Sequence, residues 1–236
     1  MKKLVLVASV AALAACGQQD NGGSTDVSLD SDVQQASYAI GYRTGEQMYG
    51  NTEDLDLDAF LAGLRAGAKG ETDLPMAEED LDAAIVAYQQ RKVSEREDEM
   101  RQLSGANADE GEAFRAENAE RDGVIVTESG LQYEVIESGD GDSPTLNDLV
   151  VAHYHGTLVD GTVFDSSVER GEPATFPLGQ VIEGWQEALQ LMSEGDKWRI
   201  VLPPELAYGE QGAGQQIGPN ATLVFEVELV EVRAAD

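Results

Sequence analysis

Residues 151–167 read VAHYHGTLVDGTVFDSS, and this stretch decides the fold of the chain. It predicts a strand, a tight turn at residues 159–162 and a second strand, because an Asp-Gly pair readily takes the positive φ angles that hairpin turns require. We expect Tyr154 on the first strand, and Phe164 and Asp165 at the end of the second. An aromatic hydroxyl, an aromatic face and a carboxylate should therefore converge near one hairpin.

The rest of the second half also has the period of two that is typical of strands. Side chains alternate in this way along residues 131–136 and again along residues 223–230. A single short helix is expected between these segments, over residues 181–192. An antiparallel sheet that closes over one helix is an α+β arrangement, and we predict it for residues 123–236.

The first half has helical spacing instead, with apolar and small residues every three or four positions. The expected helices are one capped by Ser31 or Asp32 and ended by Gly50-Asn51, one capped by Asp56 or Asp58 and ended by Gly70, and one beginning after Pro75. Glycine weakens a helix interior, so we expect Gly105 and Gly111 to interrupt the last helix before a final turn near Phe114.

The composition excludes some classes of partner. The 236 residues include 45 acidic and 15 basic side chains, which gives a formal net charge of −30. A chain this acidic is repelled by nucleic acid and by anionic lipid surfaces, so neither is an expected partner. With 42% hydrophobic residues, the chain still has enough apolar side chains for a core.

Residues 1–16 have the pattern of an export signal. Lysines at positions 2 and 3 precede an apolar run too short to span a bilayer, and the sequence LAAC closes it at Cys16. This resembles a bacterial lipoprotein signal, with residues 1–15 as signal peptide, Cys16 as the lipidated residue and residues 16–30 as a flexible tether. Gly17 then indicates sorting to the outer membrane of a Gram-negative bacterium, with the body periplasmic or surface-exposed. An ordinary secretory signal with a coincidental cysteine is the alternative.

Further motifs follow the hairpin in order along the chain: VIEGW (residues 181–185), LAYG (206–209) and ATLVFEVEL (221–229). Together with the hairpin they resemble the FKBP-type peptidyl-prolyl cis-trans isomerases over residues 123–232. The resemblance implies a C-terminal antiparallel half-barrel wrapped on one short helix, and an isomerase that acts on X–Pro bonds in polypeptides without a cofactor.

The helical half resembles, more loosely, the dimerisation region of the Mip-like and FkpA-like bacterial members of this family. The similar segments are SYAIGY (residues 37–42) and GEAFRAEN (residues 111–118). The expected helices are too few to bury a compact core alone, and a homodimer through residues 31–122 would supply the missing surface. A monomeric helical spacer is the alternative.

The reaction that the resemblance implies needs no nucleophile. A peptide bond resists rotation by about 18–20 kcal/mol because of its resonance, whereas the two isomers of an X–Pro bond have similar energies. Twisting the bond removes its charge separation, so an apolar pocket that excludes water favours the twisted form over the planar one. An aromatic pocket therefore suits this chemistry.

Carried over residue by residue, the resemblance implies a complete pocket. Trp185 is the expected floor beneath the prolyl ring, and Tyr208 the expected hydrogen-bond donor to a substrate carbonyl. Asp165, held by Arg170 in an ion pair, should lie near the twisting carbonyl. The expected walls are Tyr154, Phe164, Val181, Ile182, Ile217 and Phe225.

Two positions depart from the family pattern. Ala174 stands where many members carry an aromatic residue, and Gln216 where an aliphatic residue is common. The pocket should be more open on that side, which weakens the expectation of tight binding to macrolide inhibitors such as rapamycin.

The possible metal patterns are incomplete. His153 and His155 share one face of a strand, but two ligands without a third make a poor site. Residues 54–58 open like a calcium loop, yet Ala59 and Arg65 stand where glycine and glutamate are needed. We expect packing and helix capping to explain these residues, and no metal.

The leading hypothesis is a lipid-anchored, dimeric prolyl isomerase that assists protein folding in the cell envelope. A second is an ATP-independent holdase chaperone whose helical dimer binds unfolded chains. A third is a scaffold lipoprotein with a vestigial pocket, which the intact aromatic set argues against. Turnover on a short X–Pro peptide separates the first two, because a holdase needs no turnover.

Overall fold

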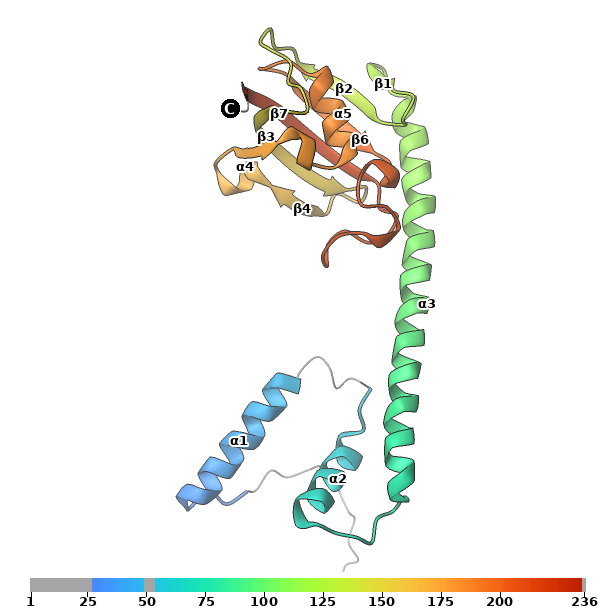
Figure 1. Cartoon of the computed structure of the whole chain (residues 1–236), viewed down its shortest axis with the longest axis vertical. Coiled ribbons are helices and arrows are strands. Elements are labelled where there is room, and N and C mark those ends of the chain that lie inside the picture. The colour runs from blue at the N-terminus through green and yellow to red at the C-terminus, as the bar shows by residue number, and fades with distance from the viewer. Residues whose placement is uncertain (1–26, 49–53, 235–236) are drawn as a thin grey trace, which may run out of the picture. The chain divides into compact units, whose positions relative to one another are not determined.

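The computed structural model describes residues 27–48 and 54–234, and the chain divides between Ala77 and Glu78 into two compact units (Figure 1). The expected signal segment, Cys16 and the expected helix end at residues 50–51 lie outside the described residues. The boundary that we predicted, between a helical domain at residues 31–122 and an isomerase domain at residues 123–236, is a division by role and stays a prediction.

The first unit holds the helices α1 (Asp32–Met48) and α2 (Leu57–Lys69). Ser31 Oγ accepts a hydrogen bond from the Gln34 amide at 3.2 Å, and the Asp56 carboxylate accepts one from the Ala59 amide at 2.9 Å. Both bonds satisfy amides that the start of a helix leaves unpaired. Ser31 and Asp56 are therefore the caps that the chain uses, and Gly70 ends α2 in the left-handed conformation, as predicted.

The second unit begins with α3 (Glu78–Ala119), a continuous helix of 42 residues. The prediction that Gly105 and Gly111 interrupt it is wrong. A glycine in a helix interior costs only about 1 kcal/mol relative to alanine, and the C-terminal half of α3 gains contacts by docking on the sheet. Gly111 is buried there against Thr222, to which Arg115 donates a hydrogen bond. At this position the missing side chain allows the helix to approach the sheet.

We expect opposite effects from alanine at the two glycines. In Gly111→Ala the new Cβ would lie 2.3 Å from Thr222 Oγ1 and 3.1 Å from Thr222 Cβ, so either the buried Thr222 side chain or the helix must shift. Overpacking of this kind costs about 1–3 kcal/mol, which should lower the melting temperature by several degrees. Gly105→Ala is the matched control, since no atom lies within 4 Å of its Cβ, and it should keep or raise the melting temperature. Equal melting curves by circular dichroism would contradict the Gly111 contact.

An antiparallel seven-stranded sheet forms the body of the second unit (Figure 1). Its strands are β1 (Val124–Val126), β2 (Gln132–Glu137), β3 (Leu149–Leu158), β4 (Val163–Ser166), β5 (Ala174–Pro177), β6 (Lys197–Leu202) and β7 (Leu223–Arg233). The order is β1-β2-β6-β7-β3-β4. The strand β5 pairs with residues 149–152 of β3, and β4 pairs with residues 155–157 of the same strand. The path ends at β1 and β4 without closing on itself.

The helix α5 (Glu183–Leu191) packs against the sheet, as predicted for residues 181–192. Its Trp185, Ala188 and Leu189 are buried in one core cluster with residues of β3, β6 and β7. The shorter helices are α4 (Ser167–Arg170), η1 (Leu178–Gln180), η2 (Pro204–Leu206) and η3 (Gly209–Gln211). The predicted α+β fold, with a helical region before the sheet, is confirmed.

The predicted alternation holds along residues 225–230 of β7 but not at Val224, which is buried, and it fails in β2. Along β7, Phe225 and Val227 are buried while Glu226 between them is exposed. In β2, the polar Gln132 is buried because the end of α3 covers it. Its side chain accepts from Asn118 Nδ2 at 2.7 Å and donates to a carbonyl of α3 at 2.8 Å. The docking of α3 therefore overrides the pattern of the strand.

Candidate functional site

The predicted hairpin is present as β3 and β4. Gly156 pairs with Asp165 across the two strands, and Gly161 takes a φ of 88° in the turn between them. Asp160 Oδ1 accepts a hydrogen bond from the Thr162 amide at 2.8 Å, which favours the turn. The hairpin thus sets the register that places Asp165 beside the middle of β3.

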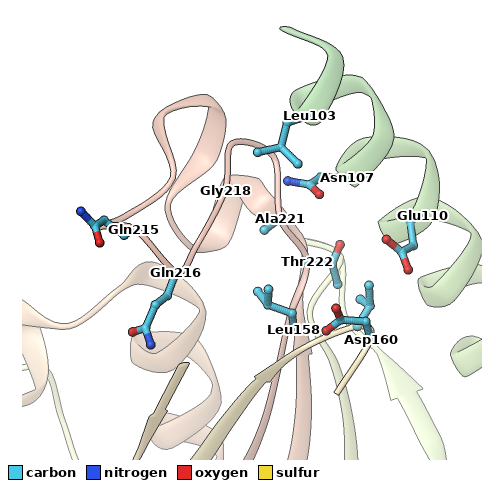
Figure 2. A pocket seen from close by; sticks show the side chains of 11 residues that line it. Leu103, Asn107, Glu110, Leu158, Asp160, Gln215, Gln216, Gly218, Ala221 and Thr222 are labelled. Carbon is cyan, nitrogen blue, oxygen red and sulfur yellow. The ribbon is translucent and has the colours of Figure 1, made fainter. Parts of the chain in front are cut away.

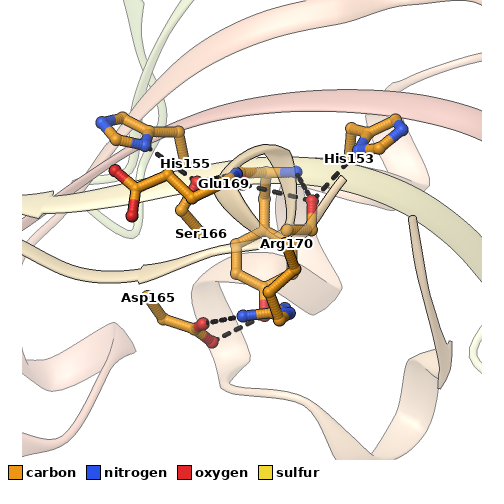
Figure 3. A network of polar contacts seen from close by, with 8 residues as sticks. His153, His155, Asp165, Ser166, Glu169 and Arg170 are labelled. Carbon is orange, nitrogen blue, oxygen red and sulfur yellow. Dashed lines mark hydrogen bonds and ion pairs between the residues drawn. The ribbon is translucent and has the colours of Figure 1, made fainter. Parts of the chain in front are cut away.

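Tyr154, Asp165 and Arg170 form a polar cluster at this hairpin, and Figure 3 shows the pairing of Asp165 with Arg170. The Tyr154 hydroxyl donates to Asp165 Oδ2 at 2.6 Å and accepts from Arg170 Nη2 at 2.7 Å. Arg170 Nη1 also donates to Asp165 Oδ1 in an ion pair, and its guanidinium carbon lies 5.5 Å from the centroid of the Tyr154 ring. The ion pair expected between Asp165 and Arg170 is present, and it engages the tyrosine as well.

The helix α4 places Arg170 in this cluster. Ser166 Oγ accepts from the Glu169 amide at 3.2 Å and so caps the helix, and Gly171 ends it in the left-handed conformation. Ser167 Oγ accepts from the Tyr154 amide at 2.7 Å, which ties the first residue of α4 to β3. A four-residue helix with a cap at each end therefore brings the guanidinium back to the hairpin.

The cluster shifts the pKa values of Tyr154 and Asp165 in opposite directions. Burial, and then the hydrogen bond to Asp165, raise the pKa of Tyr154 above its usual value. Partial burial alone would raise the pKa of Asp165, but the hydrogen bonds from Tyr154 and Arg170 outweigh burial and hold it below its usual value. Tyr154 therefore stays a neutral hydroxyl, and Asp165 stays a carboxylate, across the physiological pH range.

An aromatic cluster surrounds Trp185, which is 5% exposed at the start of α5. The ring centroids of Tyr154, Phe176 and Phe225 lie 5.4, 5.7 and 5.4 Å from that of Trp185, all nearly perpendicular to the indole. Each such contact contributes about 0.5–1.5 kcal/mol beyond its burial, so the indole is held in one orientation. Phe164 extends the cluster through an edge contact with Phe225 at 5.4 Å.

Sequence reasoning missed two parts of this cluster, Phe176 and Gly156. Phe176 on β5 contacts both Trp185 and Tyr154, and its signal was the alternation of a short apolar segment after Ala174. A Cβ on Gly156 would lie 2.7 Å from Phe164 and 2.8 Å from Phe225, so the glycine makes room for both rings. A glycine inside a predicted strand often marks such a close approach.

The other expected pocket residues lie at the rim of the same core. Val181, Ile182 and Ile217 are half-buried and pack against the core cluster. Tyr208 is 40% exposed on the segment between η2 and η3, so it is accessible to a ligand. Of the two departures from the family pattern, Ala174 is half-buried against the core cluster and Gln216 is exposed.

The two histidines bond to serines of the hairpin region. His153 Nδ1 lies 3.2 Å from Ser167 Oγ, and His155 Nδ1 lies 3.0 Å from Ser166 Oγ (Figure 3). Among residues 27–48 and 54–234, no group of three or more histidine, cysteine, aspartate or glutamate side chains has the geometry of a metal site. Both contacts link a histidine of β3 to a serine at the start of α4.

Two family models match the chain. Residues 33–135 match the "Domain amino terminal to FKBP-type peptidyl-prolyl isomerase", and residues 141–230 match the "FKBP-type peptidyl-prolyl cis-trans isomerase". The FKBP-type 22 kDa peptidyl-prolyl cis-trans isomerase of Escherichia coli is 48% identical over 210 residues, which cover 88% of this chain and 99% of that protein. The chain belongs to the FKBP-type peptidyl-prolyl cis-trans isomerase family.

This FKBP is similar to relatives over its helical region as well as its sheet. The outer membrane protein MIP of Legionella longbeachae is 37% identical over 235 residues, which cover 100% of both chains. The crystal structure of FkpA from Escherichia coli superposes with a TM-score of 0.71 over 89% of this chain and 100% of the FkpA chain, with 36% sequence identity. The family predicted from the motifs is confirmed, and with it the enzyme class.

Proposed function

We propose that this FKBP rotates X–Pro bonds on the surface formed by the aromatic and polar clusters. The observation that carries the proposal is the orientation of Trp185, which three edge-to-face contacts hold at the base of the aromatic cluster. The prolyl ring rests on this indole. The walls are Tyr154, Phe164, Val181, Ile182, Ile217 and Phe225, and Tyr208 donates a hydrogen bond to a substrate carbonyl.

The proposed mechanism works through solvation and uses no covalent step. The planar amide is stabilised by charge separation that water solvates well, and the twisted amide has lost this separation. An apolar surface that displaces water therefore binds the twisted state better than the planar one. Arg170 neutralises Asp165 beside this surface, so the twisting bond meets aromatic rings and a paired carboxylate without an excess charge.

We expect kcat/KM for an X–Pro peptide to be flat between about pH 5 and 9. The lowered pKa of Asp165 means that its paired carboxylate persists above the usual aspartate pKa and is lost only as the pH falls through the lower folded-state value. The raised pKa of Tyr154 means that its hydroxyl is lost only at a pH above the usual tyrosine value. Initial rates across this range check the expectation, and an inflection inside it would contradict a cluster of fixed charge.

The proposed role in the cell is catalysis of protein folding. X–Pro isomerisation takes tens of seconds without a catalyst and can limit folding. With a protein whose slow refolding phase is limited by one X–Pro bond, substoichiometric amounts of this FKBP should accelerate that phase. A holdase would instead need about one molecule per folding chain. Its effect on refolding would also persist in a variant that no longer turns over peptides. Rapamycin should inhibit the reaction, weakly if the open side at Ala174 matters.

The proposed location is the outer membrane, through a lipid on Cys16. The sequence pattern at residues 1–16 supports this, as does similarity to a protein named as an outer membrane protein. Within the described residues, no helix has both the length and the apolar character needed to cross a membrane. In a Gram-negative host, Cys16→Ser should leave the protein unlipidated and remove it from the outer-membrane fraction. Unchanged fractionation would count against the anchor.

The proposed assembly is a homodimer through residues 31–122. The apolar side chains of α1 and α2 support it, because neither helix buries a residue within the described chain. Val33 and Ile40 on α1 are each 68% exposed, and Leu57 and Leu64 on α2 are each 58% exposed. Exposed apolar faces of this extent favour a partner surface. Light scattering should give twice the chain mass, and a monomer mass would refute the assembly.

A further inference from the structure

The loop at residues 207–222 carries two of the proposed substrate contacts, Tyr208 and Ile217. It runs from η2 through η3 to the start of β7. Inside the loop, Ala213 and Ile217 exchange backbone hydrogen bonds of 2.8 and 3.1 Å. These bonds shape the tip, but they do not fix the loop relative to the rest of the pocket.

Two side-chain hydrogen bonds between α3 and the loop hold the base of this loop, and a third joins α3 to Thr222 at its end. Asn107 Nδ2 donates to the Pro219 carbonyl at 2.8 Å, and Asn220 Nδ2 donates to Ser104 Oγ at 2.7 Å. Ser104 and Asn107 lie three residues apart, so they share one face of the helix. Asn220 is held at a φ of 55°, a conformation that non-glycine residues rarely adopt. The surrounding contacts therefore determine its backbone.

Each bond holds the backbone next to one of the two proposed substrate contacts. The Asn220 amide donates to the Gly209 carbonyl at 2.8 Å, which ties Ser104 to the neighbour of Tyr208. On the other side of the loop, Asn107 lies against Gly218, the residue after Ile217, where an added Cβ would be only 2.8 Å from Asn107 Nδ2. The helix therefore touches the backbone beside Ile217.

The side chains of α3 and of the loop do not pack continuously against each other. A cavity of about 200 Å³ lies where α3, the loop and the turn between β3 and β4 meet (Figure 2). Its lining includes Leu103, Asn107 and Glu110 of α3, Gln216 and Ala221 of the loop, and Asp160 of the turn. Because apolar contact is incomplete here, these two hydrogen bonds contribute to the restraint on the loop, together with the bond to Thr222 at its end. A loop that loses them must be ordered by the substrate on binding, which weakens binding.

We propose that Ser104 and Asn107 of α3 are positioning residues of the isomerase, which fix Tyr208 and Ile217 for substrate binding. The inference rests on the proposed function of the pocket. It gives the end of the long helix a part in catalysis, although both residues lie outside residues 123–236, where every proposed substrate contact is found. The bonds restrain the loop before substrate arrives, so their loss should appear mainly in KM.

The test uses the full-length chain with Ser104→Ala and Asn107→Asp. The first removes an acceptor, and the second replaces an amide donor by an acceptor of nearly equal size that faces the Pro219 carbonyl. Each should lower kcat/KM for a short X–Pro peptide by about threefold or more, chiefly through a higher KM. Ser94→Ala and Gln102→Glu are the matched controls, because both residues are exposed on α3 and the second adds the same charge. Both controls should match the wild type.

Two further measurements separate positioning from general damage. Ser104→Thr keeps the hydroxyl acceptor and should restore the wild-type KM. Hydrogen exchange at the Asn220 and Ile217 amides should accelerate in Ser104→Ala and Asn107→Asp, while amides of β7 stay protected. The inference is overturned if the wild type is active and Ser104→Ala and Asn107→Asp keep its KM. It is also overturned if Ser104→Thr is as impaired as Ser104→Ala. Failure of the proposed function differs, since the wild type itself would then not catalyse.

Discussion

Trp185→Leu should lower kcat/KM for an X–Pro peptide by about tenfold or more, which corresponds to about 1.4 kcal/mol in the barrier. The indole is the floor of the proposed pocket and the common neighbour of Tyr154, Phe176 and Phe225. Leucine keeps the site apolar but cannot offer a flat surface to the prolyl ring. The loss should therefore fall on the twisted state and appear in kcat as well as in KM.

Trp198→Leu is the matched control. Trp198 is also 5% exposed and belongs to the same core cluster, yet it stacks on Tyr133 with ring centroids 4.4 Å apart, on β6 and β2. Both substitutions remove a buried indole and should destabilise the fold by a comparable amount. Rates are compared at a temperature where both variants are folded. A Trp185→Leu enzyme as active as Trp198→Leu would show that the floor of the pocket is misassigned.

Gly156→Ala should also lower kcat/KM by about tenfold or more. The added Cβ would lie 2.7 Å from Phe164 and 2.8 Å from Phe225, closer than non-bonded carbon atoms approach, so the two rings must turn or separate. Both rings are proposed walls, and an edge contact at 5.4 Å links them. The strand can keep its pairing while the pocket changes shape, and KM should rise.

Gly139→Ala controls for lost stability. Its Cβ would lie 2.0 Å from the Glu194 carbonyl oxygen and 2.7 Å from the Asp196 amide, which are backbone atoms that yield less easily than a ring. This variant should melt at a lower temperature than Gly156→Ala but keep the activity of the wild type wherever it is folded. If both variants lose activity in proportion to the decrease in their melting temperatures, the loss in Gly156→Ala reflects stability and not the shape of the pocket.

Local signals in the sequence were enough to predict much of this fold. The Asp-Gly turn, the cap at Asp56 and the end of α2 at Gly70 depend on one or two neighbouring residues, and all three are present. The motifs in order along the chain predicted the family, which the comparisons confirm. The polar cluster was expected only in part, since the Asp165–Arg170 pair was predicted but its bonds to Tyr154 were not.

Features that depend on distant segments could not be predicted in this way. Gly111 lies within a helix because Thr222, far along the chain, packs against it. Gln132 is buried because α3 covers its strand. Phe176 joins the aromatic cluster because β5 pairs with β3, a register that a four-residue strand does not reveal. In each case a tertiary contact overrides the local pattern.

Exchange of a short X–Pro peptide between its cis and trans forms, followed by NMR in the presence of the full-length chain, tests the central claim most directly. Uncatalysed exchange takes about 10–100 s at 25 °C. With catalytic amounts of the wild type or of Trp198→Leu, the cis and trans resonances should exchange much faster than without enzyme, and with Trp185→Leu this acceleration should largely disappear. Exchange at the uncatalysed rate with folded wild-type protein would contradict the account.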